Sequence, residues 1–451
     1  MITADLRIPG DLHDALLADV AGRTEWAGYL LCGVLRGARE VLLGREWCPV
    51  PAAMQLTGTG HGFSWHPDFD VQMLNRMQRE GLAGVIVHYH GGTRPHLSGD
   101  DRATAASLMP FLSSEAGDRL HAFAVLGDRA ISGSVYRDGT EVGALGAVRV
   151  TGTCLDEWPA AGTAGAVDER HDRLARGFGE QAFRRLSQAR VGVVGSGGGA
   201  AHVLQQLAYL GIGGITPVDA DRVDITSLNR LIGALPPRRR TLLDRLLGRG
   251  KGDVGRLKVE VMKQMINAID PDIEITPFAE FFPTMATVEG LRHCDLIVAC
   301  VDRLQVRDDL NRFCKRYLIP LIDVGIEITP DRCRPGAVEA ITGRVTKVMP
   351  AGPCLRCQGI IDDEKLAAER DGQPLGYTGA ARVPDPAVVT LNGIVASAAA
   401  TEVLQQLTGF AGTSSPNCGW IYDGLAGTLE RATKVYRGCG ACRYERGLGD
   451  M

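Results

Sequence analysis

The sequence predicts an α/β protein made of two consecutive domains. The second part of the chain alternates strand-like and helical segments, which favours a largely parallel sheet covered by helices; its strand-like segments are 191–194, 215–219, 296–300 and 318–324. In the first part, helical spacing of apolar residues at 11–17 and 69–77 flanks strand-like 28–33 and 84–87, which predicts a mixed α/β module. With 451 residues, 45% of them apolar, the chain is long enough for two or three cores.

The composition narrows the class of partner. The chain has 49 basic and 53 acidic residues and a net charge of −4, so no electrostatic feature indicates a nucleic acid or a membrane surface. No apolar run approaches the roughly 18 residues that cross a bilayer, and Asp5 and Arg7 interrupt a signal-peptide reading of the start. We therefore expect a cytoplasmic protein that acts on small molecules and proteins.

The domain boundary is predicted from a change in composition. Strand-like 133–136 and 146–150 precede a stretch of small residues that is typical of a linker. We expect a first domain at 1–150, a linker at 151–167 and a second domain at 168–451. The insert 236–251 is locally basic, and two readings stay open: a solvated loop, or a phosphate or partner contact.

The first domain carries a candidate metal site. His88 and His90 are two residues apart on a predicted strand, so both imidazoles point to one face and can bind one ion. Asp101 would complete three protein ligands and leave a fourth position for water. Ser98 falls near the start of the following helix, where it can cap and donate toward an oxyanion. Glu25, just before a strand, is the candidate general base.

This set, a Glu and then His-x-His-x7-Ser-x2-Asp, resembles the JAMM metallopeptidases. The resemblance implies a catalytic zinc held by His88, His90 and Asp101, with Glu25 as base and Ser98 as oxyanion helper. The family often has Pro after the second His, whereas Gly91 and Gly92 follow here, which leaves the grip on substrate open. A structural or surface His pair is the alternative.

The second domain opens with a glycine turn. Gly195, Gly197 and Gly198 follow a strand-like segment, and such a turn brings a backbone close to pyrophosphate at a helix N-terminus. Asp219 lies where an acidic residue can hold a ribose. These features alone describe a dehydrogenase equally well.

Further residues separate the two readings. Arg230 and Lys258 can neutralise a triphosphate and its leaving pyrophosphate, and Asp302 can hold Mg²⁺. A hydride-transfer site does not need them. The pattern resembles the ThiF/MoeB adenylyltransferases and the adenylating domain of ubiquitin-activating enzymes, from about residue 168 to 444. The resemblance implies ATP binding by Asp219, Asp221, Asn229 and the residues named above. It also makes Arg173 an arginine finger, supplied by the other subunit of a homodimer. Arg303 replaces the family's common Asn, so its role is open.

The cysteines add an independent indication. Cys354, Cys357, Cys439 and Cys442 form two Cys-x-x-Cys pairs that can build a closed tetrahedral zinc site. Free or redox thiols are the alternative. The segment 358–417 contains no Cys, although family members that form a thioester carry one there. Cys333, flanked by two Arg, is the best remaining thiol, while Cys294, Cys300 and Cys314 fit small buried residues.

Together the two resemblances imply a bifunctional enzyme with two zinc ions, one catalytic and one structural, and Mg·ATP. It would cleave after the C-terminal Gly of a ubiquitin-like or sulfur-carrier protein, for maturation or deconjugation, and adenylate the exposed carboxylate. Two alternatives stay open. One is adenylation of a peptide terminus in antimicrobial nucleotide-peptide synthesis, with an accessory peptidase. The other is a JAMM domain that only docks the small protein.

Overall fold

The computed structural model divides the chain into two compact units. It describes residues 2–450 apart from 24, 38, 57–63, 91–94, 117–118, 128–129, 159–168, 238–251, 332, 372–385, 413–418 and 433–437. The first unit comprises 1–164, 315–318 and 443–451, and the second comprises 165–314 and 319–442. Within the described residues, no helix is both long and apolar enough to cross a bilayer.

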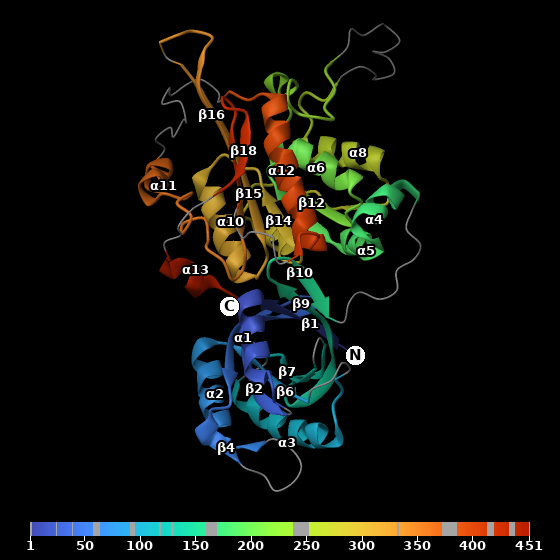
Figure 1. The fold of residues 1–451 in the computed structure, drawn as a ribbon, viewed down its shortest axis with the longest axis vertical. Helices are drawn as coiled ribbons and strands as arrows, with labels where there is room; N and C mark the ends of the chain where they lie inside the picture. The colour runs from blue at the N-terminus through green and yellow to red at the C-terminus, as the bar shows by residue number, and fades with distance from the viewer. Residues whose placement is uncertain are drawn as a thin grey trace. The chain divides into compact units, whose positions relative to one another are not determined.

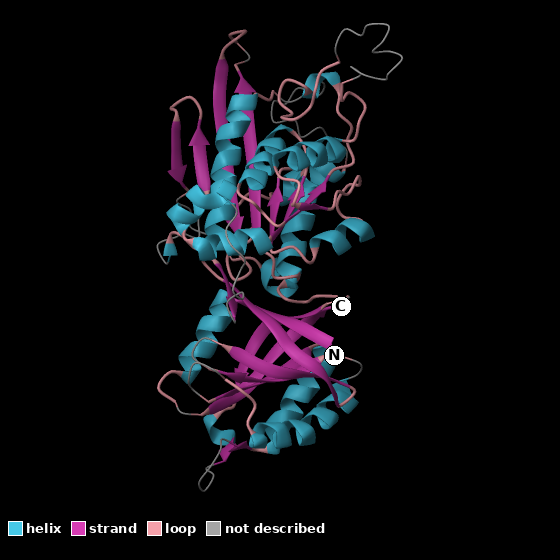
Figure 2. Cartoon of the chain, turned by 90° about the vertical axis from the view of Figure 1, so that its right-hand side faces the viewer, coloured by secondary structure: helices cyan, strands magenta, loops and turns pink. Residues whose placement is uncertain are grey.

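The first unit is a mixed sheet that closes on itself. Its strands run in the order β1-β3-β2-β6-β7-β8-β9-β10, and β1 also pairs with β9. Figure 2 shows these strands curving into a partial barrel with helices beside them. The strands are β1 (Ile2–Pro9), β2 (Trp26–Leu35), β3 (Glu40–Pro49), β6 (Ala83–Tyr89), β7 (His121–Leu126), β8 (Ile131–Arg137), β9 (Thr140–Thr151) and β10 (Leu155–Trp158). A short ribbon of β4 (Gln55–Leu56) and β5 (Ser64–Trp65) stands apart.

Helices cover both sides of this sheet. α1 (Gly10–Val20) contributes to one apolar cluster, and α2 (Pro67–Glu80) and α3 (Gly99–Ala116) contribute to the other. Because both sides are covered, β2 is buried along its whole length, which explains its continuous apolar run. α2 begins at Pro67, as its fixed φ favours, and ends at Gly81 in the left-handed region.

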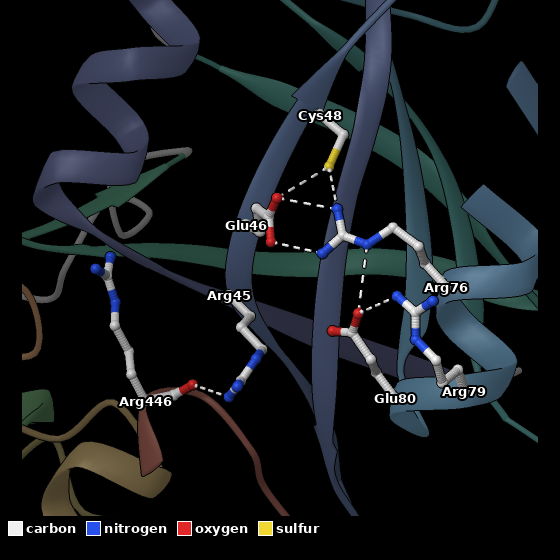
Figure 3. Close-up of polar contacts among 7 residues, drawn as sticks. All are labelled: Arg45, Glu46, Cys48, Arg76, Arg79, Glu80 and Arg446. Atoms are coloured by element: carbon white, nitrogen blue, oxygen red, sulfur yellow. Dashed lines mark hydrogen bonds and ion pairs between the residues drawn. The ribbon is translucent and has the colours of Figure 1, made fainter. Parts of the chain in front are cut away.

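A charged cluster fastens β3 to α2 on the surface (Figure 3). Arg76 of α2 donates to both carboxylate oxygens of Glu46, at 2.9 and 2.7 Å, and also contacts Glu80. Cys48 lies beside this pair, and burial raises the pKa of its thiol to about 12. Figure 3 also shows Arg45 donating to the carbonyl of Arg446, which belongs to the same unit. Cys48 is therefore a packing residue rather than a nucleophile.

The second unit contains the predicted parallel sheet. Its strand order is β13-β12-β11-β14-β15-β16-β17-β18. In the first five strands of this order, each strand is parallel to its neighbours. The parallel strands are β11 (Arg190–Val194), β12 (Gly214–Val218), β13 (Glu274–Ile275), β14 (Leu296–Ala299) and β15 (Leu321–Pro330). The antiparallel extension consists of β16 (Val338–Val348), β17 (Trp420–Asp423) and β18 (Thr428–Arg431). The mixed α/β class and the largely parallel sheet are thus confirmed.

Helices flank this sheet, and α12 lies along α6 and over β15 and β16 (Figure 1). The helices are α4 (Asp172–Phe178), α5 (Glu180–Gln188), α6 (Gly198–Tyr209), α8 (Lys258–Ile269), α9 (Met285–Leu291), α10 (Leu304–Arg316), α11 (Asp363–Arg370), α12 (Val389–Thr408) and α13 (Gly440–Glu445). One predicted strand began too early: β15 starts at Leu321 rather than 318. Leu318 has a positive φ of 54°, and Pro320 lacks the N–H that a ladder needs.

The strand order creates a reversal point in the sheet. The chain runs from β11 outward to β12 and β13, and then returns to the other side of β11 for β14 and β15. Connections therefore leave the carboxyl ends of β11 and β14 in opposite directions. In open α/β sheets, ligands bind at this place.

Candidate functional sites

The glycine turn lies at the reversal point. Gly195 follows β11 with a φ of +91°, and a Cβ there would lie 2.4 Å from the carbonyl oxygen of Cys300, at the end of β14. Gly197 is the N-cap of α6, and, its chain neighbours apart, no heavy atom of the described residues lies within 4 Å of a Cβ built on it. Gly195 thus lets two strand ends meet, whereas Gly197 leaves open space at a helix N-terminus. Such a terminus attracts anions.

Asp219 ties this turn to the end of β12. Its Oδ2 accepts from the backbone N of Ser196 at 2.6 Å, and its Oδ1 accepts from the backbone N of Asp221 at 2.7 Å. Burial raises the pKa of this carboxyl, although Lys258 nearby acts in the opposite direction. The carboxylate therefore shapes the turn, in addition to the ribose contact expected from sequence.

The structure brings the expected cations to the same edge of the sheet. Lys258, the first residue of α8, pairs with Asp221 at 2.7 Å. Arg230 donates to the carbonyl of Thr226 at 2.5 Å and to Asn229 Oδ1 at 3.2 Å. A Cβ on Gly198 would lie 3.1 Å from Arg230 Cγ, so the arginine stem runs beside the start of α6.

Two residues that were expected in the nucleotide site are exposed. Asp302 is exposed in the connection between β14 and α10, which leaves the same edge of the sheet. Arg173 is exposed on α4 and makes no ion pair within the described part of the chain. The structure of one chain therefore does not join Arg173 to the glycine turn.

Sequence reasoning missed two buried polar groups in this region. Asn392 of α12 is buried, and its Nδ2 would lie 2.7 Å from a Cβ on Gly198. Nothing in the sequence around Asn392 indicates this contact, because the two residues are 194 positions apart by subtraction. The second is the buried pair of Arg307 and Asp323. Asp323 had a readable signal, since a carboxylate inside an apolar strand must find a partner.

The histidine motif of the first unit forms a compact cluster. His88 Nδ1 lies 2.7 Å from Asp101 Oδ1, and His90 Nε2 lies 3.0 Å from Asp101 Oδ2. Both are hydrogen-bond distances, shorter than the separation of about 3.4 Å between nitrogen and oxygen ligands of a tetrahedral zinc ion. One ligand atom from each of the three residues nevertheless lies within 4.8 Å of the others, so the group could hold one ion after a small adjustment of the side chains. Burial would raise the pKa of Asp101, but hydrogen bonds from Ser98 and His88 outweigh it and lower the pKa to about 2. His88 Nε2 is buried without a partner among the described residues.

Ser98 stands where the sequence placed it, directly before α3. Its Oγ accepts from the backbone N of Asp101 at 3.1 Å, which is the N-cap interaction. The hydroxyl also donates to Asp101 Oδ2 at 2.6 Å. In this state the Ser98 proton is directed at the carboxylate, and an oxyanion would have to compete for it.

The strand register places Glu25 on the side of the histidines. β2 pairs antiparallel with β6, so that Trp26 lies opposite Tyr89 and Ala27 opposite His88. Glu25 directly precedes β2 and His90 directly follows β6, so the two residues would be level if the ladder continued by one pair. Because side chains alternate along a strand, Glu25, Ala27 and the two histidines share the face covered by α3.

The four paired cysteines converge on one point. Cys354 Sγ lies 3.6 Å from Cys357 Sγ and 3.4 Å from Cys439 Sγ, and Cys357 Sγ lies 3.8 Å from Cys442 Sγ. All four are free thiols. Sulfurs at about 2.3 Å from a tetrahedral zinc ion lie about 3.8 Å apart, whereas disulfide sulfurs lie about 2.05 Å apart. The arrangement fits a metal and not a disulfide.

Three of the remaining cysteines lie in the interior or have a raised pKa, and one is exposed. Cys294 and Cys314 are buried, and burial raises the pKa of Cys300 to about 12. Cys333 is exposed, but the neighbouring Arg334 pairs with Asp331 at 2.7 Å. The stretches 238–251 and 91–92, where the basic insert and the softer JAMM loop were expected, lie outside the described residues.

Most of the second unit is similar to a known protein family. The model of the ThiF family matches residues 171–236 and 241–441. The tRNA threonylcarbamoyladenosine dehydratase of Haemophilus influenzae is 28% identical over 35% of this chain and 55% of its own length. The molybdopterin-synthase adenylyltransferase of Escherichia coli is 26% identical over 60% of this chain and 93% of its own length.

A third relative is the SAMP-activating enzyme E1 of Haloferax volcanii, 29% identical over 40% of this chain and 56% of its own length. The chain thus spans little more than half the length of two of these three relatives. Apart from residues 315–318, the family match lies in the second unit, which contains the glycine turn and the four cysteines. It covers more than half of the sequence and confirms the resemblance inferred from residues 168–444: the chain belongs to the ThiF family.

Proposed function

We propose that the second unit adenylates the C-terminal carboxylate of a small ubiquitin-like or sulfur-carrier protein that ends in Gly-Gly. One observation carries this proposal. The open N-terminus of α6, Asp219, Arg230 and Lys258 gather at the reversal point of a ThiF-family sheet. Two relatives are named as a molybdopterin-synthase adenylyltransferase and a SAMP-activating enzyme, which supports a protein carboxylate as substrate.

The chemistry assigns each residue a task. A carboxylate oxygen of the substrate attacks the α-phosphorus of ATP, the bond from that phosphorus to the bridging oxygen breaks, and pyrophosphate leaves. Arg230 and Lys258 would exchange their present partners for phosphate oxygens and neutralise the growing charge. Asp219 would hold the ribose, with Asp221 and Asn229 beside the nucleotide. Asp302 would hold Mg²⁺, which supplies further charge neutralisation.

The acyl adenylate would pass directly to an external nucleophile. Segment 358–417 contains no Cys, Cys294 and Cys314 are buried, and burial raises the pKa of Cys300. A sulfur donor or a thiol of a partner protein would therefore receive the acyl group. We assign the cluster of Cys354, Cys357, Cys439 and Cys442 to a structural zinc ion, since four sulfurs leave no open position for catalysis.

We further propose that residues 1–150 are a JAMM-type zinc peptidase that cleaves after the terminal Gly of the same small protein. His88, His90 and Asp101 would hold the ion, which supplies Lewis-acid activation of water. Glu25 would take the proton of that water and later return it to the leaving amine. Ser98 would donate to the oxyanion once its bond to Asp101 is released. Two observations support this proposal: one ligand atom from each of the three residues lies within 4.8 Å of the others, and the Nε2 of His88, which has no partner among the described residues, is available for the ion while Nδ1 bonds to Asp101.

The decisive experiment is ATP–pyrophosphate exchange with the full chain and candidate proteins that end in Gly-Gly. Exchange that depends on such a protein supports the proposal. A stable nucleotide product on a short peptide would favour peptide adenylation instead. About two zinc ions per chain support the peptidase, whereas about one, lost on mutation of Cys357, would favour a first unit that only docks the small protein.

From the family resemblance we also propose a homodimer in which each active site receives the partner subunit's Arg173, whose exposed position on α4 is compatible with this role. The test is complementation between two inactive variants. Arg173→Ala and Arg230→Ala chains, mixed under conditions that allow subunit exchange, should regain part of the exchange activity, because the mixed dimer contains one intact site. If the mixture stays as inactive as its components, Arg173 does not act across a dimer.

A further inference from the structure

A buried ion pair lies beneath the loop that carries Asp302. Arg307 of α10 is 2% exposed, Asp323 of β15 is fully buried, and the Arg307 guanidinium donates to both oxygens of the carboxylate. Arg344 donates to the same carboxylate at 2.6 Å. Removing these charges from water costs several kcal/mol per ion by order of magnitude, so a buried pair is weak support for stability alone. Its contacts suggest another role.

Arg307 also binds the main chain of two segments, the loop after β14 and the strand β15. Its Nη2 donates to the carbonyl of Val301 at 2.5 Å and to the carbonyl of Val324 at 3.2 Å. Val301 directly precedes Asp302. One guanidinium thus links the Asp302 loop to β15 while the Asp323 carboxylate fixes its orientation. Only the planar, five-donor group of arginine can make this set of bonds, because a lysine amine has three donors at one point.

The other side of the same loop is fixed by a second carboxylate. Glu369 of α11 accepts from the backbone N of Leu304 at 3.1 Å and from the backbone N of Gln305 at 2.8 Å. These are the first two amides of α10, which have no partner within the helix. Asp302 and Arg303 therefore lie between two held points, the carbonyl of Val301 and the start of α10.

We propose that Arg307 is a positioning residue for adenylation, which holds Asp302 where it can receive Mg²⁺ with ATP. The inference rests on the proposed function of the second unit. Arg307 would not touch the nucleotide. It would set the path of the Val301–Asp302 main chain, so its loss would change the Mg²⁺ dependence of ATP binding more than the binding of ATP without metal.

The test measures ATP affinity by calorimetry at several Mg²⁺ concentrations and in EDTA, on the full chain. In wild type, Mg²⁺ should strengthen ATP binding. Arg307→Met and the milder Arg307→Lys should lose most of that gain, about tenfold in affinity, with little change in EDTA. Asp302→Asn should lose the same gain. Arg307→Met added to Asp302→Asn should have no further effect, because both changes remove one interaction.

Arg431→Met is the matched control. Arg431 pairs with Glu402, which is 1% exposed, and lies over the ring of Trp420, away from the Asp302 loop. Like Arg307→Met, the Arg431→Met substitution removes an arginine from a buried carboxylate. It should therefore lower the free energy of unfolding without altering the gain in ATP affinity that Mg²⁺ provides. Equal effects of Arg431→Met and Arg307→Met, or additive effects of Arg307→Met and Asp302→Asn, would overturn the positioning role. The positioning role would also be overturned if Mg²⁺ strengthened ATP binding equally in wild type and in both Arg307 variants. In that case the proposed adenylation would still stand. Wild type that binds no ATP would remove both.

Discussion

Replacing Gly195 and Gly197 by alanine should separate the folding role of the glycine turn from its binding role. At Gly195 the φ of +91° costs a residue with a side chain about 1–2 kcal/mol. The new Cβ would also lie 2.4 Å from the Cys300 carbonyl oxygen, a backbone atom that cannot rotate away. Overpacking of this kind costs about 1–3 kcal/mol. Gly195→Ala should therefore lower the free energy of unfolding by about 2–5 kcal/mol, the sum of these costs.

Gly197→Ala should behave in the opposite way. Its φ is −80°, and in the part of the chain that the structure describes no heavy atom other than those of its chain neighbours lies within 4 Å of the added carbon, which leaves room for it. The loss of chain entropy in the unfolded state could even stabilise the protein by about 0.4–1 kcal/mol. If ATP phosphates occupy that open space, the methyl group would cost about 1–3 kcal/mol of binding, or about fivefold to 150-fold in affinity.

Two assays on the full chain distinguish the roles. Thermal unfolding by scanning calorimetry should show a midpoint lowered by about 5–15 °C for Gly195→Ala and unchanged or raised for Gly197→Ala. Calorimetric titration with Mg·ATP should show weakened binding for Gly197→Ala. The reasoning is refuted if Gly197→Ala binds ATP as tightly as wild type, because the phosphates then lie elsewhere. It is equally refuted if Gly195→Ala unfolds at the wild-type temperature.

Three further changes test other parts of the chain. Glu25→Ala should abolish cleavage of a Gly-Gly fusion while zinc content and adenylation persist, and Arg230→Ala should do the reverse; loss of both activities from either change would contradict separate sites. Cys357→Ser should lower the zinc content by about one ion per chain and lower the unfolding midpoint of the second unit, and an unchanged metal content would argue against the four-sulfur site. His121 is fully buried, and burial, with Arg119 nearby, lowers its pKa from 6.5 to about 4. As the pH falls, His121 is protonated in the unfolded chain at a higher pH than in the folded chain. The contribution of His121 to the free energy of unfolding is therefore fully present above about pH 6.5 and should fall by about 3 kcal/mol as the pH drops to 4. Urea unfolding should show this slope in wild type, and a His121→Gln variant with the same slope would assign it to other groups.

The sequence by itself determined the α/β class and the parallel strands, and it indicated the residue types of three candidate sites. This was possible because each motif is local: His88 and His90 share a strand face by alternation, and Ser98 and Asp101 share one helical turn. The glycine turn was readable for the same reason, since one strand, one turn and one helix specify it. The Cys-x-x-Cys pairs were readable because each pair is a local unit.

Only the tertiary structure decided how distant segments meet. It placed Asn392 beside Gly198, joined Arg307 to Asp323 and Val301, and directed Asp219 to the amide of Ser196. It also set the register that pairs Trp26 with Tyr89 and Ala27 with His88. Strand order and register depend on which apolar faces pack together across the whole unit, and local periodicity does not encode that choice. The sequence therefore specifies the chemical groups, and the packing of the sheet specifies which of them can act together.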